Sequence, residues 1–294
     1  MIPAMDRRTP AQYFRQSLKS EAYHADEIIN IYLLRPLASV IVWMIYPTRI
    51  APNHVTIAAI VVGCAAAWVY LIGTPVAIAA AGLLVTMKDI IDDADGQLAR
   101  AKQLYSRRGR FLDSIGDFVV DVMLFASITA VVCRLHPGIA TIAVGILALS
   151  GLTLRVSYHV FYQVSFLHRE ERYMLNRIVE KITEDDRRGD RVALRLQVIF
   201  NWIYKWQDTM MIRVDDWCGA RRISPDRLKD WYSDRIGLRL SGLLGFGTEL
   251  GVLTVCSLVN QLYVYLWLNL FLMNAIWVAS ILYRRIILLH SLTR

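Results

Sequence analysis

Cysteine is scarce in this chain of 294 residues, and its four cysteines show no paired C-x2-C spacing. The sequence therefore indicates neither a zinc site nor a disulfide framework. The first thirty residues lack an uninterrupted apolar stretch, so we expect no cleavable signal peptide. Charged residues make up only 20% of the chain, whereas 55% are hydrophobic and the mean hydropathy is +0.38. This balance excludes an ordinary soluble domain and is typical of a multi-span membrane protein.

The net charge of +8 is distributed in a way that argues against a nucleic-acid partner. Basic residues flank the apolar segments, as expected for cytoplasmic loops that contact anionic lipid headgroups. We therefore expect membrane lipids, and no nucleic acid, among the partners.

The apolar segments predict an all-α integral membrane protein with six transmembrane helices. An apolar run at 37–46 is too short to cross a bilayer and predicts an interfacial juxtamembrane helix before them. We divide the chain into an N-terminal polar segment with this helix, 1–50, and a six-span membrane domain, 51–294. The expected spans lie near 55–71, 75–88, 109–133, 139–166, 238–258 and 262–283.

The basic residues also predict an orientation. Of the 33 lysines and arginines, only Arg134 falls in the short loops near positions 73, 136 and 261. The positive-inside rule makes the other side cytoplasmic, with both termini on it. We expect a multi-pass protein of the inner or cell membrane.

A polar stretch interrupts the spans at about 168–236 and predicts a cytoplasmic helical insert. Its second half is rich in aromatic residues, including Trp202, Trp206 and Trp217. This pattern predicts an amphipathic helix that rests on the membrane or on the neighbouring helices. A lid over a site is the alternative.

Four of the seven aspartates in the segment 88–121, which leads from the second expected span into the third, lie at helical spacing. Asp92 and Asp95 share one helix face, and Asp113 and Asp117 share another. Two such helices facing each other would bring four carboxylates together, which requires neutralising cations. Carboxylate oxygens suit Mg²⁺ or Mn²⁺. The alternative is that these acids stabilise helix N-termini. It fits Asp113, but not Asp92 and Asp95, which lie near the C-terminal end of a helix, where the helix dipole disfavours acids.

Four further charged residues lie close to these aspartates. They are either supporting groups of the site or solvated side chains, and the sequence favours solvated side chains. The four are Lys88, Asp89, Asp93 and Asp121.

The spacing D-x2-D-G-x2-A-R-x8-G-x3-D-x3-D, from Asp92 to Asp117, resembles the signature of the CDP-alcohol phosphotransferase family at every defining position. The resemblance covers about 52–166, and the last two spans by architecture only. It implies a homodimeric membrane enzyme that transfers a substituted phosphoryl group from a CDP-alcohol to a hydroxyl and releases CMP.

The resemblance also implies roles for particular residues. Asp92, Asp95, Asp113 and Asp117 would bind two Mg²⁺ or Mn²⁺ ions, and Asp117 would also be the general base. Arg100 offers a planar fork to a phosphate oxygen. Capping of the first span explains Asn53 equally well. The residues expected to bind the nucleotide or donor are Asn53, Thr56, Gly96, Ala99, Arg100 and Gly109.

Arg155 lies inside the fourth expected span, where an arginine needs a partner. That partner is either an anionic acceptor substrate or Glu249 in the fifth span, and the sequence leaves both open.

The leading hypothesis is transfer from CDP-diacylglycerol to a small polar alcohol such as inositol phosphate or glycerol phosphate. The alternative within the same chemistry is transfer from a small CDP-alcohol, such as CDP-choline, to a lipid hydroxyl. From a different class, the chain could be a divalent-cation transporter. Transporters place ion sites near mid-membrane on broken helices, whereas these acids lie at helix ends beside Arg100. The sequence does not identify the acceptor.

Overall fold

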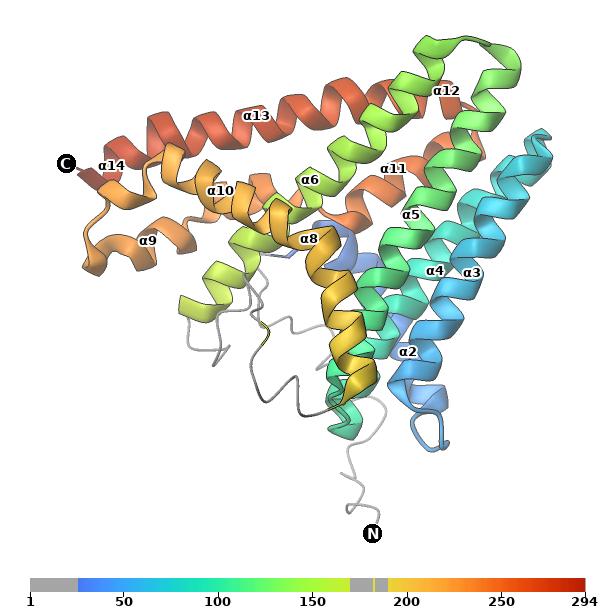
Figure 1. Ribbon diagram of the computed structural model, residues 1–294, viewed down its shortest axis with the longest axis horizontal. Helices are drawn as coiled ribbons and strands as arrows, with labels where there is room; N and C mark the ends of the chain where they lie inside the picture. The colour runs from blue at the N-terminus through green and yellow to red at the C-terminus, as the bar shows by residue number, and fades with distance from the viewer. Residues whose placement is uncertain (1–25, 170–181, 183–189, 294) are drawn as a thin grey trace.

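The computed structural model describes residues 26–169, 182 and 190–293, and every regular element within them is a helix (Figure 1). The all-helical prediction is therefore confirmed for these residues. The predictions for 1–25 and for most of 168–189 lie outside them.

Among the described residues of the first half of the chain, one short π-helix precedes five α-helices. Pro52 and Pro75 each occupy the first position of a helix, where a missing N–H costs nothing. Gln103, with positive φ, ends the longer helix that carries Asp92 and Asp95. The elements are η1 (Asn30–Leu34), α2 (Arg35–Ile45), α3 (Pro52–Ile72), α4 (Pro75–Lys102), α5 (Arg107–Leu135) and α6 (Ile139–Arg169).

The second half begins with the long helix α8 (Arg191–Cys218), which Asp190 caps through its side chain. Short helices then lead to a bent pair and to a final run of α- and π-helical segments. These elements are η2 (Ala220–Arg222), η3 (Pro225–Arg227), α9 (Leu228–Ser233), α10 (Arg235–Gly242), α11 (Phe246–Leu258), α12 (Leu262–Trp267), η4 (Leu268–Met273), α13 (Asn274–Leu282), η5 (Tyr283–Leu288) and α14 (Leu289–Thr293).

Four helices among the described residues are long and apolar enough to cross a membrane: α3, α5, α6 and the run Leu262–Thr293. The pair α10 and α11, bent by 41°, makes a fifth if it counts as one span. Helix α4 is apolar in its first half, but charged residues from Lys88 onward keep it out of this group. A shorter apolar helix, Asn30–Ile45, precedes the candidate spans, and its place in the membrane interface remains a prediction. Six spans remain a prediction.

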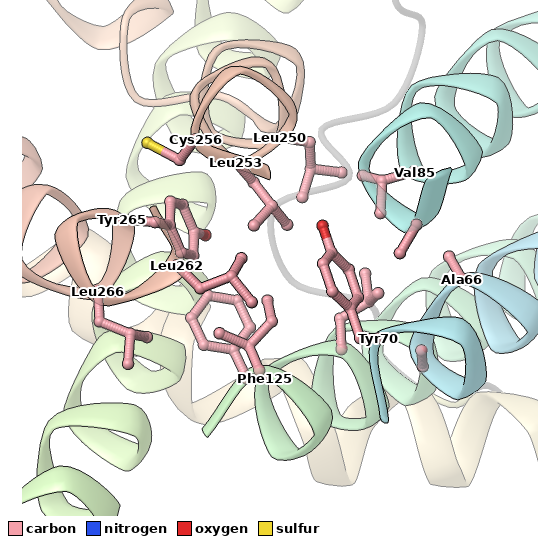
Figure 2. Packing of buried hydrophobic residues seen from close by; sticks show 14 of the residues in the cluster. Ala66, Tyr70, Val85, Phe125, Leu250, Leu253, Cys256, Leu262, Tyr265 and Leu266 are labelled. Carbon is pink, nitrogen blue, oxygen red and sulfur yellow. The ribbon is translucent and has the colours of Figure 1, made fainter. Parts of the chain in front are cut away.

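Helices α3, α4, α5 and α11 share one apolar core with α12 (Figure 2). Tyr70 from α3, Val85 from α4, Phe125 from α5 and Leu253 from α11 meet there, all nearly inaccessible to solvent. The Tyr70 hydroxyl also lies 2.6 Å from the Ser257 hydroxyl of α11. This packing fixes the relative positions of α4 and α5, the two helices that carry the aspartates.

Helix α8 packs against α5 and α6, which is one of the two positions predicted for the insert. Its Tyr204 hydroxyl donates to the Ser114 carbonyl of α5 at 2.7 Å, and Ser157 of α6 donates to Gln207 at 2.6 Å. On the outward face of α8, Trp202 and Trp206 are 79% and 55% exposed. The helix is therefore amphipathic, with its polar and aromatic inner face on the membrane domain.

The end of α8 is tied to α6 and α9 by the buried carboxylate of Asp215. It accepts hydrogen bonds from the Tyr162 hydroxyl at 2.9 Å, the Trp231 indole at 3.0 Å and the Tyr232 hydroxyl at 2.7 Å. Burial raises the pKa of Asp215, while these three donors act in the opposite direction.

Candidate active site

The aspartates of α4 and α5 meet because a short turn connects the two helices. Ser106 caps α5 by accepting from the Gly109 N–H at 3.2 Å, so α5 starts directly beside the end of α4. Asp92, Asp95 and Asp113 each place one carboxylate oxygen within 4.8 Å of the other two. The prediction that the two helices face each other with their acids is therefore confirmed for these three residues.

The three carboxylates fit a divalent cation. The Asp113 Oδ1 atom is buried and has no hydrogen-bond partner among the described residues. Such an oxygen is costly to bury unless it binds something. Hard cations such as Mg²⁺ are bound by carboxylate oxygens of this kind. Burial, and then repulsion by Asp92, raises the pKa of Asp95 to about 7, which a bound cation would reverse.

Asp117, the fourth predicted ligand, has a different neighbour. Its Oδ1 atom lies 2.5 Å from the ammonium of Lys88 on α4. The same ammonium lies 3.7 Å from an oxygen of Asp92 and 3.7 Å from an oxygen of Asp89. The fourth carboxylate is thus present in the cluster, but an internal cation binds it.

The charged residues beside the motif were expected to be solvated, and for three of them this is wrong. Lys88, Asp89 and Asp121 are buried. Asp93 is partly buried, and one of its carboxylate oxygens is inaccessible and unpartnered among the described residues. The reason is packing, because α3 and α11 pack against α4, and α3 also packs against α5. A signal was available for Lys88, which lies four residues before Asp92 and hence on the same helix face.

The start of α3 contacts the site through Thr56 and Asn53. The Thr56 hydroxyl donates to Asp95 Oδ2, which fixes that carboxylate. The capping role considered for Asn53 is wrong, because Ala51 is the N-cap of α3 and Asn53 lies in the first turn. The Asn53 side-chain oxygen instead faces Gly109, where an added Cβ would lie 2.4 Å from it. Gly109 thus permits the close approach of α3 and α5.

The face of α4 around Gly96 is open. A Cβ at Gly96 would meet nothing closer than the Arg100 guanidinium, 3.4 Å away. No neighbour in the described chain requires a glycine there, in contrast to Gly109. Ala99 is half-buried and Arg100 is exposed one turn further along. This arrangement leaves room for a ligand between the three carboxylates and the arginine.

Arg155 lies apart from this cluster. Its side chain is fully buried, and Nη2 lies 3.0 Å from Glu249 Oε2. Nη1 donates to the Asn274 side chain at 2.7 Å and to the Asn269 carbonyl at 3.2 Å. Glu249, the partner considered in the fifth expected span, therefore binds Arg155. This contact supports a structural ion pair over binding of an anionic acceptor. Acceptor binding by Arg155 stays a prediction.

Comparison with known proteins adds independent information. The model of the CDP-alcohol phosphatidyltransferase family matches residues 49–182. A bifunctional IPC transferase and DIPP synthase of Archaeoglobus fulgidus is 34% identical over 95 residues, which are 32% of this chain and 18% of that protein. The protein of the same name from Thermococcus kodakarensis is 36% identical over 73 residues, 25% of this chain and 16% of that one. The chain thus spans less than a fifth of the length of these relatives.

Proposed function

We propose that the protein is a metal-dependent membrane transferase of phospholipid synthesis, because its residues 49–182 match the model of the CDP-alcohol phosphatidyltransferase family. It transfers the phosphatidyl group of CDP-diacylglycerol to the hydroxyl of a small polar alcohol, such as inositol phosphate or glycerol phosphate, and releases CMP. The observation that carries the proposal is the convergence of Asp92, Asp95 and Asp113 beside the open face at Gly96.

The donor binds along α4 and the start of α3. Gly96 and Ala99 leave space for the cytidine, and the exposed Arg100 binds a phosphate oxygen through its planar fork. Asn53, Thr56 and Gly109 line the same end of the site. Thr56 acts by orienting the Asp95 carboxylate, to which its hydroxyl donates.

The four carboxylates of Asp92, Asp95, Asp113 and Asp117 bind up to two Mg²⁺ or Mn²⁺ ions. When bound, these ions neutralise the diphosphate and stabilise the leaving CMP. Asp117 lies one helical turn beyond Asp113 and accepts the proton of the attacking hydroxyl. The Lys88 ammonium holds one Asp117 oxygen, so the proton goes to the other oxygen unless the ammonium moves away.

The membrane arrangement follows from the apolar helices. The first half of α4, at 75–88, joins the five candidate spans as a sixth, and the helix Asn30–Ile45 lies in the interface. The carboxylate cluster and both termini face the cytoplasm, as the distribution of basic residues predicts. We propose a homodimer in the cell membrane, by likeness to the family.

Two other functions are less well supported. Transfer from CDP-choline to a lipid hydroxyl would use the same carboxylates, and no contact distinguishes it. A divalent-cation transporter is disfavoured because the Lys88 ammonium lies within the cluster and would oppose passage of a cation.

The test is CMP release by the purified protein from CDP-diacylglycerol in defined Mg²⁺, with a panel of acceptor alcohols. Asp92→Asn and Asp113→Asn are expected to abolish turnover while the protein remains folded in detergent. Asp226→Asn, a change at an exposed carboxylate, serves as the matched control. Undiminished CMP release by either site variant, or metal uptake into vesicles without CMP release, would contradict the proposal.

A further inference from the structure

Lys88 is a buried cation within the carboxylate cluster. Its ammonium lies 2.5 Å from Asp117, and 3.7 Å from each of Asp92 and Asp89, while the side chain is 6% exposed. The Phe246 ring of α11 closes the other side, with its centroid 6.0 Å from Nζ. A lysine held so tightly inside a bundle is rare unless it is paired, and here the partners are the proposed metal ligands.

The cluster therefore has two unlike ends. At one end Asp92, Asp95 and Asp113 converge, and Asp113 Oδ1 is buried without a partner among the described residues. At the other end the Asp117 oxygen is already bound by an ammonium. A cation entering the first end meets the unpartnered oxygen of Asp113, whereas a cation entering the second must displace Lys88.

We propose that the Lys88 ammonium occupies part of the carboxylate site as a built-in cation. It makes the second divalent ion bind with lower affinity than the first. The first ion binds Asp92, Asp95 and Asp113, and the second binds at Asp117 only when it displaces the ammonium. This inference rests on the proposed function in one respect, namely that the carboxylates bind divalent ions.

Two buried acids outside the motif give the displaced ammonium a destination. Asp89 follows Lys88 directly on α4, with an oxygen already 3.7 Å from Nζ. Asp121 lies one turn beyond Asp117 on α5, is 7% exposed and interacts electrostatically with Lys88. A small shift of a flexible four-carbon side chain therefore exchanges one carboxylate partner for another without exposing the charge.

The exchange has a consequence for Asp117. While the ammonium is bound to Asp117 Oδ1, that oxygen cannot take a proton from an acceptor hydroxyl. The second ion replaces the ammonium at this oxygen when it completes the metal site, and the other Asp117 oxygen accepts the proton. Lys88 is therefore a positioning residue, because it acts on the reaction through Asp117 and does not itself touch the substrate.

The experiment is a Mn²⁺ titration of the metal-free protein in detergent, with free Mn²⁺ measured by electron paramagnetic resonance. The wild type is expected to bind two ions, the second about tenfold or more weaker, as removal of a nearby positive charge is worth at least that much. Lys88→Met should tighten the second ion until the two affinities differ by less than about threefold. Lys88→Arg keeps the positive charge and should therefore keep the difference between the two Mn²⁺ affinities.

Lys102→Met is the matched control, because it makes the same substitution on the same helix. The Lys102 ammonium binds the backbone carbonyls of Thr48 and Ile50 at 2.9 and 2.8 Å, away from the cluster. Both affinities should therefore stay at their wild-type values in this variant.

Two ions of equal affinity in the wild type would overturn the Lys88 proposal and leave the proposed function intact. This measurement needs no variant and decides the question even if Lys88→Met does not fold. An unchanged difference between the two Mn²⁺ affinities in folded Lys88→Met would overturn the Lys88 proposal as well. Absence of any Mn²⁺ binding to the wild type would instead remove the proposed metal site, and the Lys88 proposal with it.

Discussion

Replacement of Glu249 by glutamine is expected to destabilise the protein by about 3–5 kcal/mol, because it leaves the buried Arg155 guanidinium without a counter-charge. The two side chains are 0% and 1% exposed and lie 3.0 Å apart, so water cannot take over the role of the carboxylate. In either orientation the NH2 of the new amide would face a donor, which is Arg155 at the Oε2 position or Tyr265 and Asn269 at the Oε1 position. One change thus removes a charge and creates a clash of donors.

The reverse change should cost less. Arg155→Met leaves a buried glutamate, which can take up a proton, whereas an arginine cannot lose one. The glutamate also keeps its hydrogen bonds from Tyr265 and Asn269. The double variant Arg155→Met/Glu249→Gln has no uncompensated charge, so it should recover most of the stability that Glu249→Gln loses. The two substitutions are therefore expected to be strongly non-additive.

Thermal unfolding of the detergent-solubilised variants, followed by loss of the monodisperse peak in gel filtration, gives the order of stability. Asp226→Asn at an exposed site is the control and should stay within about 0.5 kcal/mol of the wild type. Wild-type stability of Glu249→Gln, or a double variant no more stable than that single variant, would refute the reasoning.

The same double variant separates the two roles of Arg155. If the arginine serves only the pair, the KM for the acceptor alcohol stays unchanged in the folded double variant. If it binds an anionic acceptor, this KM rises while the KM for the CDP-activated donor does not. The geometry favours the first result, because both terminal nitrogens of the guanidinium already have partners within the protein.

Three further predictions concern the proton acceptor, the topology and pH. Asp117→Asn should retain donor binding, measured by calorimetry, but lower the rate of transfer by roughly 10²–10⁴, the usual effect of losing a positioned base. Recovery of the rate at high Mg²⁺ would instead show that Asp117 is chiefly a metal ligand. Cysteines at Ile139 and Gln261 should react with an impermeant thiol reagent outside intact cells, and a cysteine at Arg221 should not; the opposite pattern would invert the orientation. Burial raises the pKa of Glu27 from 4.5 to about 8, so the stability that this group contributes is complete below pH 4.5 and is lost as the pH rises to about 8. The unfolding temperature of Glu27→Gln should therefore fall less between pH 5 and 8 than that of the wild type. Parallel curves of unfolding temperature against pH would contradict this role of Glu27.

The helical fold could be predicted because its signal is local. Apolar runs of about 20 residues identify α3, α5 and α6, and their ends coincide with prolines and polar turns. The bend between α10 and α11 was not predicted, although Gly242 and Gly245 flank the break and are local signals of a helix end. Glu27 accepts the Thr248 N–H at 2.8 Å and caps the first turn of α11, and no pattern within residues 238–258 reveals that partner.

The site could be predicted in part for a related reason. Helical spacing places Asp92 with Asp95 and Asp113 with Asp117, and a short turn makes the two helices neighbours. Spacing does not tell how deeply a residue on that face is buried. Lys88 was therefore expected in solvent, although it lies on the same face as Asp92 and binds Asp117. The depth comes from α11, whose packing on α4 is set by residues more than 150 positions further along the chain.

The two buried cation–carboxylate pairs differ in a way that assigns them different roles. Around Arg155 one positive charge meets one negative charge, and both glutamate oxygens and both terminal guanidinium nitrogens have partners. Around Lys88 one ammonium meets several carboxylates, and an oxygen of Asp113 has no partner among the described residues. A balanced pair gains nothing from a further cation, whereas an excess of acids does. Charge balance therefore favours a structural role for the Arg155 pair, whereas the excess of acids around Lys88 could be neutralised by a metal ion.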